Sequence, residues 1–571
     1  MKLHLPTKLY RAVLACCAAA FFTTLAYAEV PEGYTEVEIT DAEQLSQYVE
    51  KDYTAFLVSS SITNSTYSML GAHQFWSDSE RRKHTLAFSG IQGGSRGVIR
   101  VASELMVEKF SELVFSNNNT KYSNQVAVYG GAIYGGSGST IYLRDNGDVA
   151  FIGNAIYNSG SSSSGYNAYG GAIYIASQGC ISLTGNDSIS FSSNSCGSAT
   201  EWSRCSGGAI YGDWESTINM ASNGSVMFSG NSADGTGGAI YGNRSTISIT
   251  GNEAVTFSGN HTLFHSGDPK DYSSGGAIYC YYSPLSITGN KAVTFSGNYS
   301  PGSGGAIYIV QSPLSITGNG RVEFRGNYDT KGRYNSSPCR LCSVYTINSA
   351  LTLAAGEGQD ITFYDSLHCG GAPVSFNADY EDKDGITHKG TGDIVLSGKY
   401  AEQDLRAIKG NYMTQQDLTN SLTSEVYDMT HLYGGRLRVE DGAIYKGYGI
   451  TAEENSAATV RLQGGTLDHA GYALTFNAGT TLEAQGVNSI TASSLDLLDG
   501  SALTFTLGEA NLTAAAVTLT GTFNQGGALT INLADDGTMA LGNEYALLKI
   551  SGSTATPTTW DPTKVTVNGL D

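Results

Sequence analysis

Short runs of alternating or β-branched apolar residues recur along the middle of the chain. Three stretches that begin at Gly237, Gly275 and Gly304 align without gaps: GGAIYGNRSTISITGNEAVTFSGN, GGAIYCYYSPLSITGNKAVTFSGN and GGAIYIVQSPLSITGNGRVEFRGN. Each contains three such runs, Ala-Ile-Tyr, Leu/Ile-Ser-Ile-Thr and Val-x-Phe, separated by Gly-Asn or another polar break. Runs of this length with period-two alternation are typical of strands. No helical spacing lies between them, so the pattern predicts one coil of a parallel β-solenoid per copy.

Two motifs alternate strictly through this region. Gly-Gly-Ala-Ile begins at Gly130, Gly170, Gly207, Gly237, Gly275 and Gly304 and is always followed by Tyr. Phe-x-x-Asn begins at Phe115, Phe151, Phe191, Phe228, Phe257, Phe295 and Phe324. The interval from each Gly-Gly to the next Phe is 20 or 21 residues, whereas the interval from Phe to the next Gly-Gly varies from 9 to 19. One half of the repeat is therefore constant in length, and the other half accommodates a loop of free length.

The recurring residues acquire structural roles in a solenoid, because equivalent positions of successive coils stack. The Ile and the Phe residues are each expected to form an interior column, and burying each side chain stabilises the fold by roughly 1.5 to 3 kcal/mol. The Asn residues are expected to form an amide ladder that satisfies turn backbone groups, and the paired glycines suit a tight corner that needs positive φ or close backbone approach. The first motif supplies Gly130, Gly131, Ala132, Ile133, Gly170, Gly171, Ile173, Gly207, Gly208, Ile210, Gly237, Gly238, Ile240, Gly275, Gly276, Ile278, Gly304, Gly305 and Ile307. The second motif supplies Phe115, Asn118, Phe151, Asn154, Phe191, Asn194, Phe228, Asn231, Phe257, Asn260, Phe295, Asn298, Phe324 and Asn327.

The alternation of GGAI and FxxN resembles the passenger domains of the chlamydial polymorphic outer membrane proteins, a family of autotransporter adhesins. The resemblance covers residues 115–327 and extends to Ile-Thr-Phe-Tyr-Asp at 361–365. It implies a secreted right-handed parallel β-helix on a bacterial surface, in which the two motifs take part in adhesion to host cells. A passenger of this family is followed by a membrane barrel, but aromatic residues are sparse after residue 450 and we predict no barrel here. The protein is then secreted without its own translocator, attached through a separate outer-membrane anchor or translocator, or represented by a shortened chain.

The sequence divides into five segments of different pattern. Residues 1–28 form a signal peptide, 29–114 an N-terminal cap with the first irregular coils, and 115–327 the repeat β-helix. Residues 328–433 continue the β-helix and contain a polar, helix-permitting stretch, and 434–571 resemble looser coils of a β-solenoid passenger. A short amphipathic helix is expected over 41–51, and Thr414-x-x-Asp417 with Leu418 and Leu422 allows a second helix. The expected fold class is all-β, a right-handed parallel β-helix with an N-terminal cap and a second β-rich C-terminal segment.

The N-terminus has the features of an export signal. Three basic residues precede an apolar run, and Ala26-Tyr27-Ala28 supplies the small residues that signal peptidase selects, so cleavage is expected between Ala28 and Glu29.

Removing the signal takes the formal net charge from -20 to -23, which makes nucleic acid and anionic lipid headgroups poor partners. No later stretch approaches the roughly 20 consecutive apolar residues of a membrane helix, so no transmembrane segment is expected in the mature chain. The expected location is the bacterial cell surface, associated with the outer membrane, or the extracellular space.

The segments of variable length are candidates for recognition, because they can change without disturbing the core. They span 155–169, 195–206 and 261–274 and are rich in Ser, Gly, Asn and Tyr. Tyrosines in or near these segments either bind a partner or pack on neighbouring residues, and both interpretations stay open. They are Tyr157, Tyr166, Tyr169, Tyr272, Tyr281 and Tyr282.

Cys196 and Cys205 flank one segment, and a disulfide between them is expected in an exported protein. The pair Cys339 and Cys342 indicates a structural bridge, or a link to Cys369, more than zinc or redox chemistry, and the odd number of cysteines leaves one thiol free or intermolecular.

Some proteins with a parallel β-helix fold are polysaccharide-acting enzymes, and the positions of the acidic residues bear on this alternative. Glycoside hydrolysis needs two carboxylates about 5 to 9.5 Å apart. Four residues before the repeat Phe, Asp187 and Glu253 occupy coils that are not adjacent, and Lys291 follows Glu253. The local cluster of His261, His265, Asp268 and Asp271 lies within a single variable segment and is expected to be solvated. We therefore expect no enzyme, no catalytic or metal-binding residue and no cofactor.

The favoured function is that of an adhesin-like passenger that binds a host-cell surface protein or glycan through segments projecting from a β-helix. A purely structural envelope component without a specific ligand is the alternative, and a polysaccharide-acting enzyme is the less favoured third hypothesis. The ligand, the anchor, the disulfide pairing and the oligomeric state are beyond the sequence.

Overall fold

Each coil of the repeat region contains at least four strands, one more than the sequence predicts. In one coil these are β16 (Ile173–Ile175), β17 (Cys180–Thr184), β18 (Ser188–Ser192) and β19 (Ser195–Ser198). The additional strand is the short one that follows Phe-x-x-Asn. Each strand pairs in parallel with its equivalent in the next coil, so the four positions define four faces, which we number in chain order.

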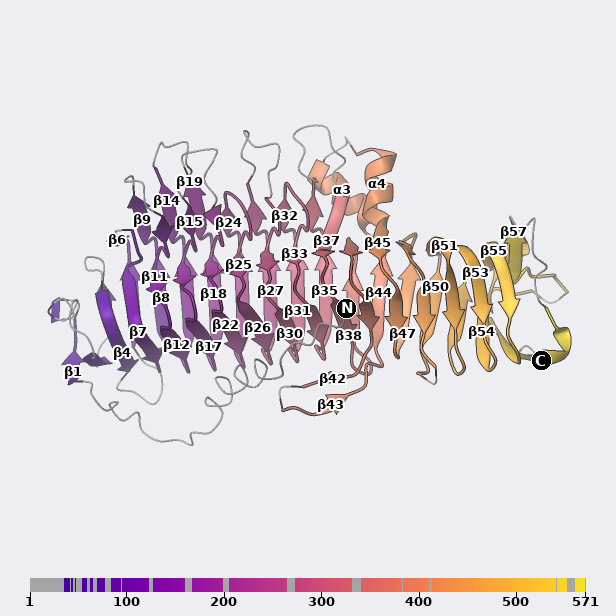
Figure 1. Cartoon of the computed structure of the whole chain (residues 1–571), viewed down its shortest axis with the longest axis horizontal. Coiled ribbons are helices and arrows are strands. Elements are labelled where there is room, and N and C mark those ends of the chain that lie inside the picture. The colour runs from indigo at the N-terminus through magenta and orange to yellow at the C-terminus, as the bar shows by residue number, and fades with distance from the viewer. Residues whose placement is uncertain are drawn as a thin grey trace, which may run out of the picture.

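The computed structural model describes residues 35–571 apart from short segments at 42, 45–46, 48–53, 59–61, 65–68, 78–83, 94, 123–126, 160–166, 199–204, 264–272, 331–339, 383, 410–412, 455, 541, 552–559 and 570–571. Over this part of the chain the protein is an all-β parallel β-helix, whose coils follow one another along a single long column (Figure 1). The signal peptide with its expected cleavage site at Ala28 and Glu29 lies outside the described residues, as does most of the helix expected over 41–51.

The first face contains β11 (Ile133–Gly135), β16, β21 (Ile210–Gly212), β25 (Ile240–Asn243), β29 (Ile278–Tyr281), β33 (Ile307–Val310), β37 (Arg340–Ile347), β40 (Ser366–Gly370), β45 (Thr423–Tyr427) and β48 (Ile444–Gly447). The second face contains β12 (Thr140–Arg144), β17, β22 (Thr217–Ala221), β26 (Thr246–Thr250), β30 (Leu285–Thr288), β34 (Leu314–Thr317), β38 (Leu351–Ala354), β41 (Val374–Phe376), β46 (Thr430–Leu432) and β49 (Ile450–Ala452). Long strands cover both of these faces at each end of the column: β4 (Met69–Ser77), β7 (Ile99–Glu108), β51 (Thr466–Phe476), β53 (Asn488–Leu497) and β55 (Val517–Gln525).

The third face contains β3 (Ile62–Asn64), β5 (Thr85–Ser89), β8 (Glu112–Ser116), β13 (Asp148–Ile152), β18, β23 (Ser225–Ser229), β27 (Ala254–Ser258), β31 (Ala292–Ser296), β35 (Arg321–Arg325), β39 (Asp360–Phe363), β44 (Asp393–Ser397), β47 (Arg436–Glu440), β50 (Thr459–Gln463), β52 (Thr481–Gln485), β54 (Ser501–Leu507), β56 (Leu529–Asp535) and β58 (Val565–Asn568). The fourth face contains β6 (Gln92–Gly93), β9 (Asn119–Tyr122), β14 (Ala155–Asn158), β19, β24 (Ser232–Ala233), β28 (His261–Thr262), β32 (Tyr299–Ser300) and β36 (Tyr328–Asp329). The remaining strands are β1 (Thr35–Ile39), β2 (Thr54–Val58), β10 (Val128–Tyr129), β15 (Ala168–Tyr169), β20 (Cys205–Ser206), β42 (Tyr380–Glu381), β43 (Thr387–His388) and β57 (Leu548–Ser551).

The third face is one continuous ladder along the column. Its pairings run without a break from β3 to β58, so the three segments divided at 327 and 433 share a sheet. The C-terminal segment therefore continues the solenoid.

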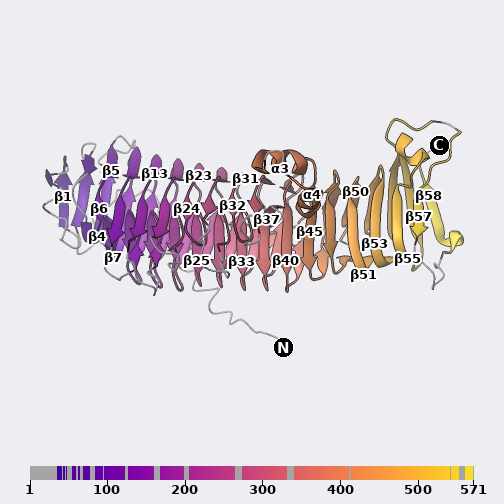
Figure 2. The same ribbon diagram turned by 90° about the horizontal axis from the view of Figure 1, so that it is seen from above.

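Two helices end the fourth face. They are α3 (Ala401–Lys409) and α4 (Gln415–Leu422), and α4 begins with the capping box of Thr414 and Asp417 that the sequence predicts. Apolar side chains of both helices pack against Leu341 of β37. Figure 2 shows the helices on one side of the column, near its middle. They cover the point at which the parallel ladder of the fourth face stops, which protects an otherwise open strand edge.

The two interior columns expected from the sequence are present. All six motif Ile residues and all seven motif Phe residues are fully buried. Each Phe ring stacks on the next, and Phe228 lies 4.7 Å from Phe191 and 4.8 Å from Phe257, measured between ring centroids. The paired glycines meet both expected requirements. Gly207 has a φ of 70°, and a side chain on Gly208 would collide with the carbonyl oxygen of Gly238 in the next coil.

The motif asparagines form the expected ladder. The Nδ2 group of Asn194 donates to Oδ1 of Asn231 at 2.9 Å and to the carbonyl oxygen of Phe151 at 2.9 Å, while its backbone N–H donates to the same Oδ1 at 3.0 Å. A second ladder, which the sequence analysis treated only as a polar break, repeats this geometry between the second and third faces. Its members are Asn146, Asn186, Asn223, Asn252, Asn290 and Asn319. Each coil thus has two corners whose buried backbone groups are satisfied by amides.

Asp365 ends the first ladder. Its carboxylate accepts hydrogen bonds from the N–H of Gly326, from the N–H and Nδ2 of Asn327 and from Oγ of Ser343, at 2.8 to 2.9 Å. An asparagine here would turn its Nδ2 group, a donor, toward the N–H of Gly326 or toward the N–H and Nδ2 of Asn327, which are donors as well. A side chain that only accepts therefore suits the last step of the ladder.

We expect the Asp365→Asn variant to lose a pH dependence of stability. Burial raises the pKa of Asp365 from 3.8 to about 6, against the lowering effect of its hydrogen bonds. The folded protein then binds this proton more tightly than the unfolded chain, so the contribution is present below pH 3.8 and is lost as the pH rises through 6. The free energy of unfolding of the wild type should fall across that window by on the order of 3 kcal/mol relative to the variant. Denaturant titrations of both proteins at several pH values measure the difference, and parallel profiles would contradict it.

Candidate binding surface

The segments of variable length leave the column at one corner, between the fourth and first faces. The strands that precede them end in register, because Asn158 of β14 aligns with Ser198 of β19 and with Tyr122 of β9. The strands that follow them also align, since Ala168 of β15 pairs with Cys205 of β20 and with Val128 of β10. The described flanks therefore place the attachment points of these segments side by side in successive coils.

The candidate tyrosines differ in their surroundings. Tyr157 is 38% exposed, with the Lys121 ammonium 5.8 Å from its ring centroid, and Tyr282 is 40% exposed. Tyr169 instead packs between Tyr129 and Tyr211, where burial raises its pKa to about 12. The structure thus leaves the first two side chains available for binding and assigns Tyr169 to packing. Tyr281 is partly buried. Tyr166 and Tyr272 lie outside the described residues, as do His265, Asp268 and Asp271 of the polar cluster.

The tyrosine that follows each GGAI forms a column that the sequence analysis did not interpret. The rings project from the first face and stack with centroid separations of 4.9 to 5.5 Å: Tyr134, Tyr174, Tyr211, Tyr241, Tyr279 and Tyr308. Tyr345, which follows Ser343-Val344 and not GGAI, adds one further ring. Because each ring covers the face of the next, the rings shield one another, and Tyr174 and Tyr211 are buried. The strict recurrence of Tyr after GGAI was the available signal.

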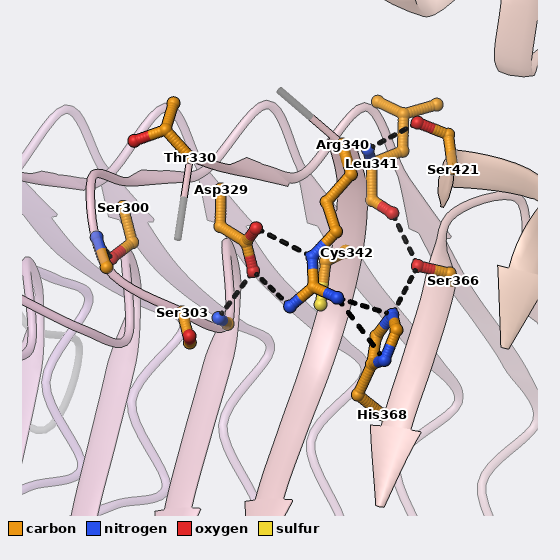
Figure 3. Close-up of polar contacts among 12 residues, drawn as sticks. Ser300, Ser303, Asp329, Thr330, Arg340, Leu341, Cys342, Ser366, His368 and Ser421 are labelled. Atoms are coloured by element: carbon orange, nitrogen blue, oxygen red, sulfur yellow. Dashed lines mark hydrogen bonds and ion pairs between the residues drawn. The ribbon is translucent and has the colours of Figure 1, made fainter. Parts of the chain in front are cut away.

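A buried charged network lies where the repeats end (Figure 3). The Arg340 guanidinium is 2% exposed and donates from Nε to Oδ1 of Asp329 at 2.8 Å and from NH2 to Oδ2 at 3.1 Å. Its NH1 group lies 2.9 Å from Nε2 of His368, whose Nδ1 lies 3.1 Å from Oε2 of Glu425. Burial lowers the pKa of His368 to about 4, and the hydrogen bond from His368 lowers the pKa of Glu425 to about 2. A neutral imidazole therefore bridges a cation and a carboxylate.

Ser366, His368 and Glu425 are the residue types of a nucleophile, a base and an orienting acid, but the contacts do not suit nucleophilic catalysis. Oγ of Ser366 lies 3.2 Å from Nε2 of His368, yet it donates its proton to the carbonyl of Leu341 at 2.6 Å. The lone pair of Nε2 is already occupied by Arg340, so the imidazole cannot accept the serine proton. Ser366 and His368 are also 2% and 4% exposed, so the arrangement serves to hold β37 and β40 at the junction.

Carboxylates align on neighbouring coils of the third face. One aligned pair is Asp360 and Asp393, on β39 and β44, where Asp393 also forms ion pairs with Arg436 and Arg438. Glu253 has no carboxylate opposite it and forms an ion pair with Lys291, which occupies the equivalent position in the next coil. Glu112 and Asp148 align on β8 and β13, a pair of acids that the sequence analysis did not consider. Both are exposed, and Asp148 accepts a hydrogen bond from Ser188 at 2.6 Å. This surface position lacks the enclosure that positions a glycan for hydrolysis.

Cys196 and Cys205 are buried in one small apolar cluster. The structure gives both as free thiols, so the expected disulfide is not formed in it. The thiol of Cys196 donates to the carbonyl of Ala168 at 3.1 Å, and burial, with the neighbouring Cys205, raises its pKa. Cys342 and Cys369 are also free thiols, and Cys339 lies outside the described residues. Pairing of Cys196 with Cys205 under oxidising conditions stays a prediction.

The residues that the structure describes contain neither a cluster of metal ligands nor a membrane-spanning helix. Among them, no three His, Cys, Asp or Glu side chains converge as metal ligands would. No helix within the described ranges combines the length and the apolar character needed to cross a membrane.

Comparison with known proteins identifies the repeat. A family model described as the Chlamydia polymorphic membrane protein repeat matches residues 188–213, 225–243, 246–281 and 284–310. The matched stretches fall on the coils that carry the stacked Ile, Phe and Asn columns. No curated protein and no solved structure matches the chain.

Proposed function

Because this chain carries repeats of the Chlamydia polymorphic membrane protein family, we propose that it is the exported passenger of a bacterial surface protein and that it adheres to host cells. The repeat family and the β-helix fold suit a surface-displayed passenger. The ligand in this proposal is a host-cell surface protein or glycan.

One observation carries the proposal. The core positions of successive coils are nearly invariant, whereas the chain between the fourth and first faces changes in length from coil to coil and starts from aligned flanks. Such an arrangement places variable segments next to one another on a rigid support, as binding loops are in other scaffolds. A scaffold that only fills space has no need of this variation. Multiple weak contacts along the column would add to one another through multivalency.

The test is adhesion of coated beads to epithelial cells. Beads carry either residues 29–571 or a variant in which 160–166, 199–204 and 264–272 are each replaced by a short Gly-Ser linker. We expect saturable adhesion by the first protein and adhesion near background by the variant, with unchanged circular dichroism. A matched control shortens the turn between β42 and β43, at a distant place on the column, and should adhere normally. Equal adhesion of all three proteins, or none by any, would favour a structural envelope component instead.

A further inference from the structure

A second corner of the β-helix, between the first and second faces, carries large side chains in the left-handed backbone region. At this corner φ lies between 48° and 61° in six successive coils. The residues concerned are Gln178, Glu215, Arg244, Tyr282, Gln311 and Asn348, and all of them are exposed. We call this row, together with Trp214 beside it, the 178–348 ridge.

Two other corners have less of this backbone strain, since the residues with a side chain and positive φ there are mostly small, such as Asn117, Asp145, Ser193 and Ser222. The corner between the second and third faces uses mainly glycine at the equivalent position, and so does the corner after the third face: Gly185, Gly251, Gly289 and Gly318, and Gly153, Gly230, Gly259, Gly297 and Gly326. A residue with a side chain pays roughly 1 to 2 kcal/mol for left-handed geometry. Large residues at five consecutive positions of one corner are therefore unfavourable for folding, and such strain is characteristic of functional surfaces.

The centre of the ridge is an exposed group of two aromatic rings and one cation. The guanidinium carbon of Arg244 lies 4.0 Å from the ring centroid of Trp214 and 5.2 Å from that of Tyr282. Trp214 is 46% exposed and Tyr282 is 40% exposed. Within the part of the chain that the structure describes, Arg244 forms no ion pair. Its side chain is held in place by the rings, while its N–H groups stay available to a ligand.

Polar groups with both donors and acceptors flank this centre. Nε2 of Gln178 donates to the Glu215 carboxylate at 3.0 Å, which leaves further acceptor capacity on that carboxylate. Gln311 and Asn348 add amides on the other side of Tyr282. Amide, carboxylate and guanidinium groups next to flat aromatic surfaces can satisfy the hydroxyls and the apolar faces of a sugar at the same time.

We propose that the 178–348 ridge binds a neutral, linear oligosaccharide that lies along the column. Sugar rings would pack on Trp214 and Tyr282, Arg244 would donate to sugar oxygens, and Glu215 would accept from hydroxyls. Successive coils, about 4.8 Å apart, place one of these side chains after another under an extended chain. The excess of negative charge on the protein, together with Glu215, opposes a polyanionic glycan. A protein partner is also less suitable, because protein hot spots lie in enclosed, desolvated patches rather than on a row one residue wide.

This inference does not depend on the proposed adhesion, because the ridge and the variable segments occupy opposite ends of the first face. The test uses residues 29–571 on immobilised oligosaccharides with terminal mannose, galactose or N-acetylglucosamine, and on their sialylated and sulfated counterparts. We expect saturable binding to at least one neutral oligosaccharide. Trp214→Ala and Tyr282→Ala should each weaken it by about tenfold or more, as loss of an aromatic anchor does. Trp560→Ala removes a tryptophan of similar exposure, 48%, at the far end of the column and should leave binding unchanged.

The proposal is overturned if no neutral oligosaccharide binds, or if Trp214→Ala binds as tightly as the wild type. It is also overturned if only sialylated or sulfated glycans bind. The same holds if the protein binds an unglycosylated peptide, and not the oligosaccharides, in a parallel assay. A lower unfolding temperature of Trp214→Ala with unaltered glycan binding would assign the stacked group to stability alone. Bead adhesion without glycan binding would leave the proposed function intact, and glycan binding without adhesion would leave the ridge intact.

Discussion

Replacing Phe228 with alanine should lower the free energy of unfolding of the repeat region by about 3 to 5 kcal/mol. The ring is fully buried and stacks between Phe191 and Phe257 with interplanar angles of 3° and 1°. Its removal leaves a cavity that the neighbouring rings cannot close, because both are held by their own coils. In the same strand, Met227 points outward and is 39% exposed, so Met227→Ala should change stability by a few tenths of a kcal/mol.

Hydrogen exchange shows where the loss falls. In a solenoid each coil contacts only its neighbours, so stability is close to a sum of local terms. In Phe228→Ala, the amides of β18, β23 and β27 should exchange faster, whereas those of β50 and β52 should exchange as in the wild type. Uniform acceleration along the whole column would contradict this local description. Equal destabilisation by Met227→Ala would contradict the assignment of Phe228 to the core.

The repeated part of the fold was predictable from the sequence because a parallel solenoid places identical positions on top of one another. Once Phe-x-x-Asn recurred at a constant distance from Gly-Gly, Phe228 and Asn231 could only occupy columns, and both do. The helix α4 was predictable for a different reason, since Thr414 and Asp417 form a local capping box that needs no knowledge of the rest of the fold.

Features that depend on contacts between unlike coils were not predictable in this way. The fourth strand was missed because in some coils, as in Ser232–Ala233, it has two residues and no alternation to detect. The junction of Arg340 with Asp329 and His368 does not recur along the chain, and the flanking Cys339 and Cys342 suggested a structural disulfide instead. The ridge around Arg244 was missed because positive φ in a non-glycine residue leaves no trace in composition.

Replacing Arg340 with methionine should destabilise the junction by about 3 to 5 kcal/mol. The guanidinium makes two hydrogen bonds to the Asp329 carboxylate, which is itself fully buried. Methionine fills part of the space but leaves that carboxylate without its counter-charge.

Two further variants separate charge from packing. Arg321→Ala removes a guanidinium that is 74% exposed and paired with Glu323, and it should cost no more than about 1 kcal/mol. The double variant Arg340→Met with Asp329→Leu removes both buried charges and should recover much of the stability that the single variant loses, since an uncompensated charge costs more than an absent pair. Thermal and denaturant unfolding of the four proteins, wild type included, measure these differences. If the double variant were no more stable than Arg340→Met alone, the network would act through shape rather than charge, and the stability of the junction would rest on the packing of α3 and α4 against β37.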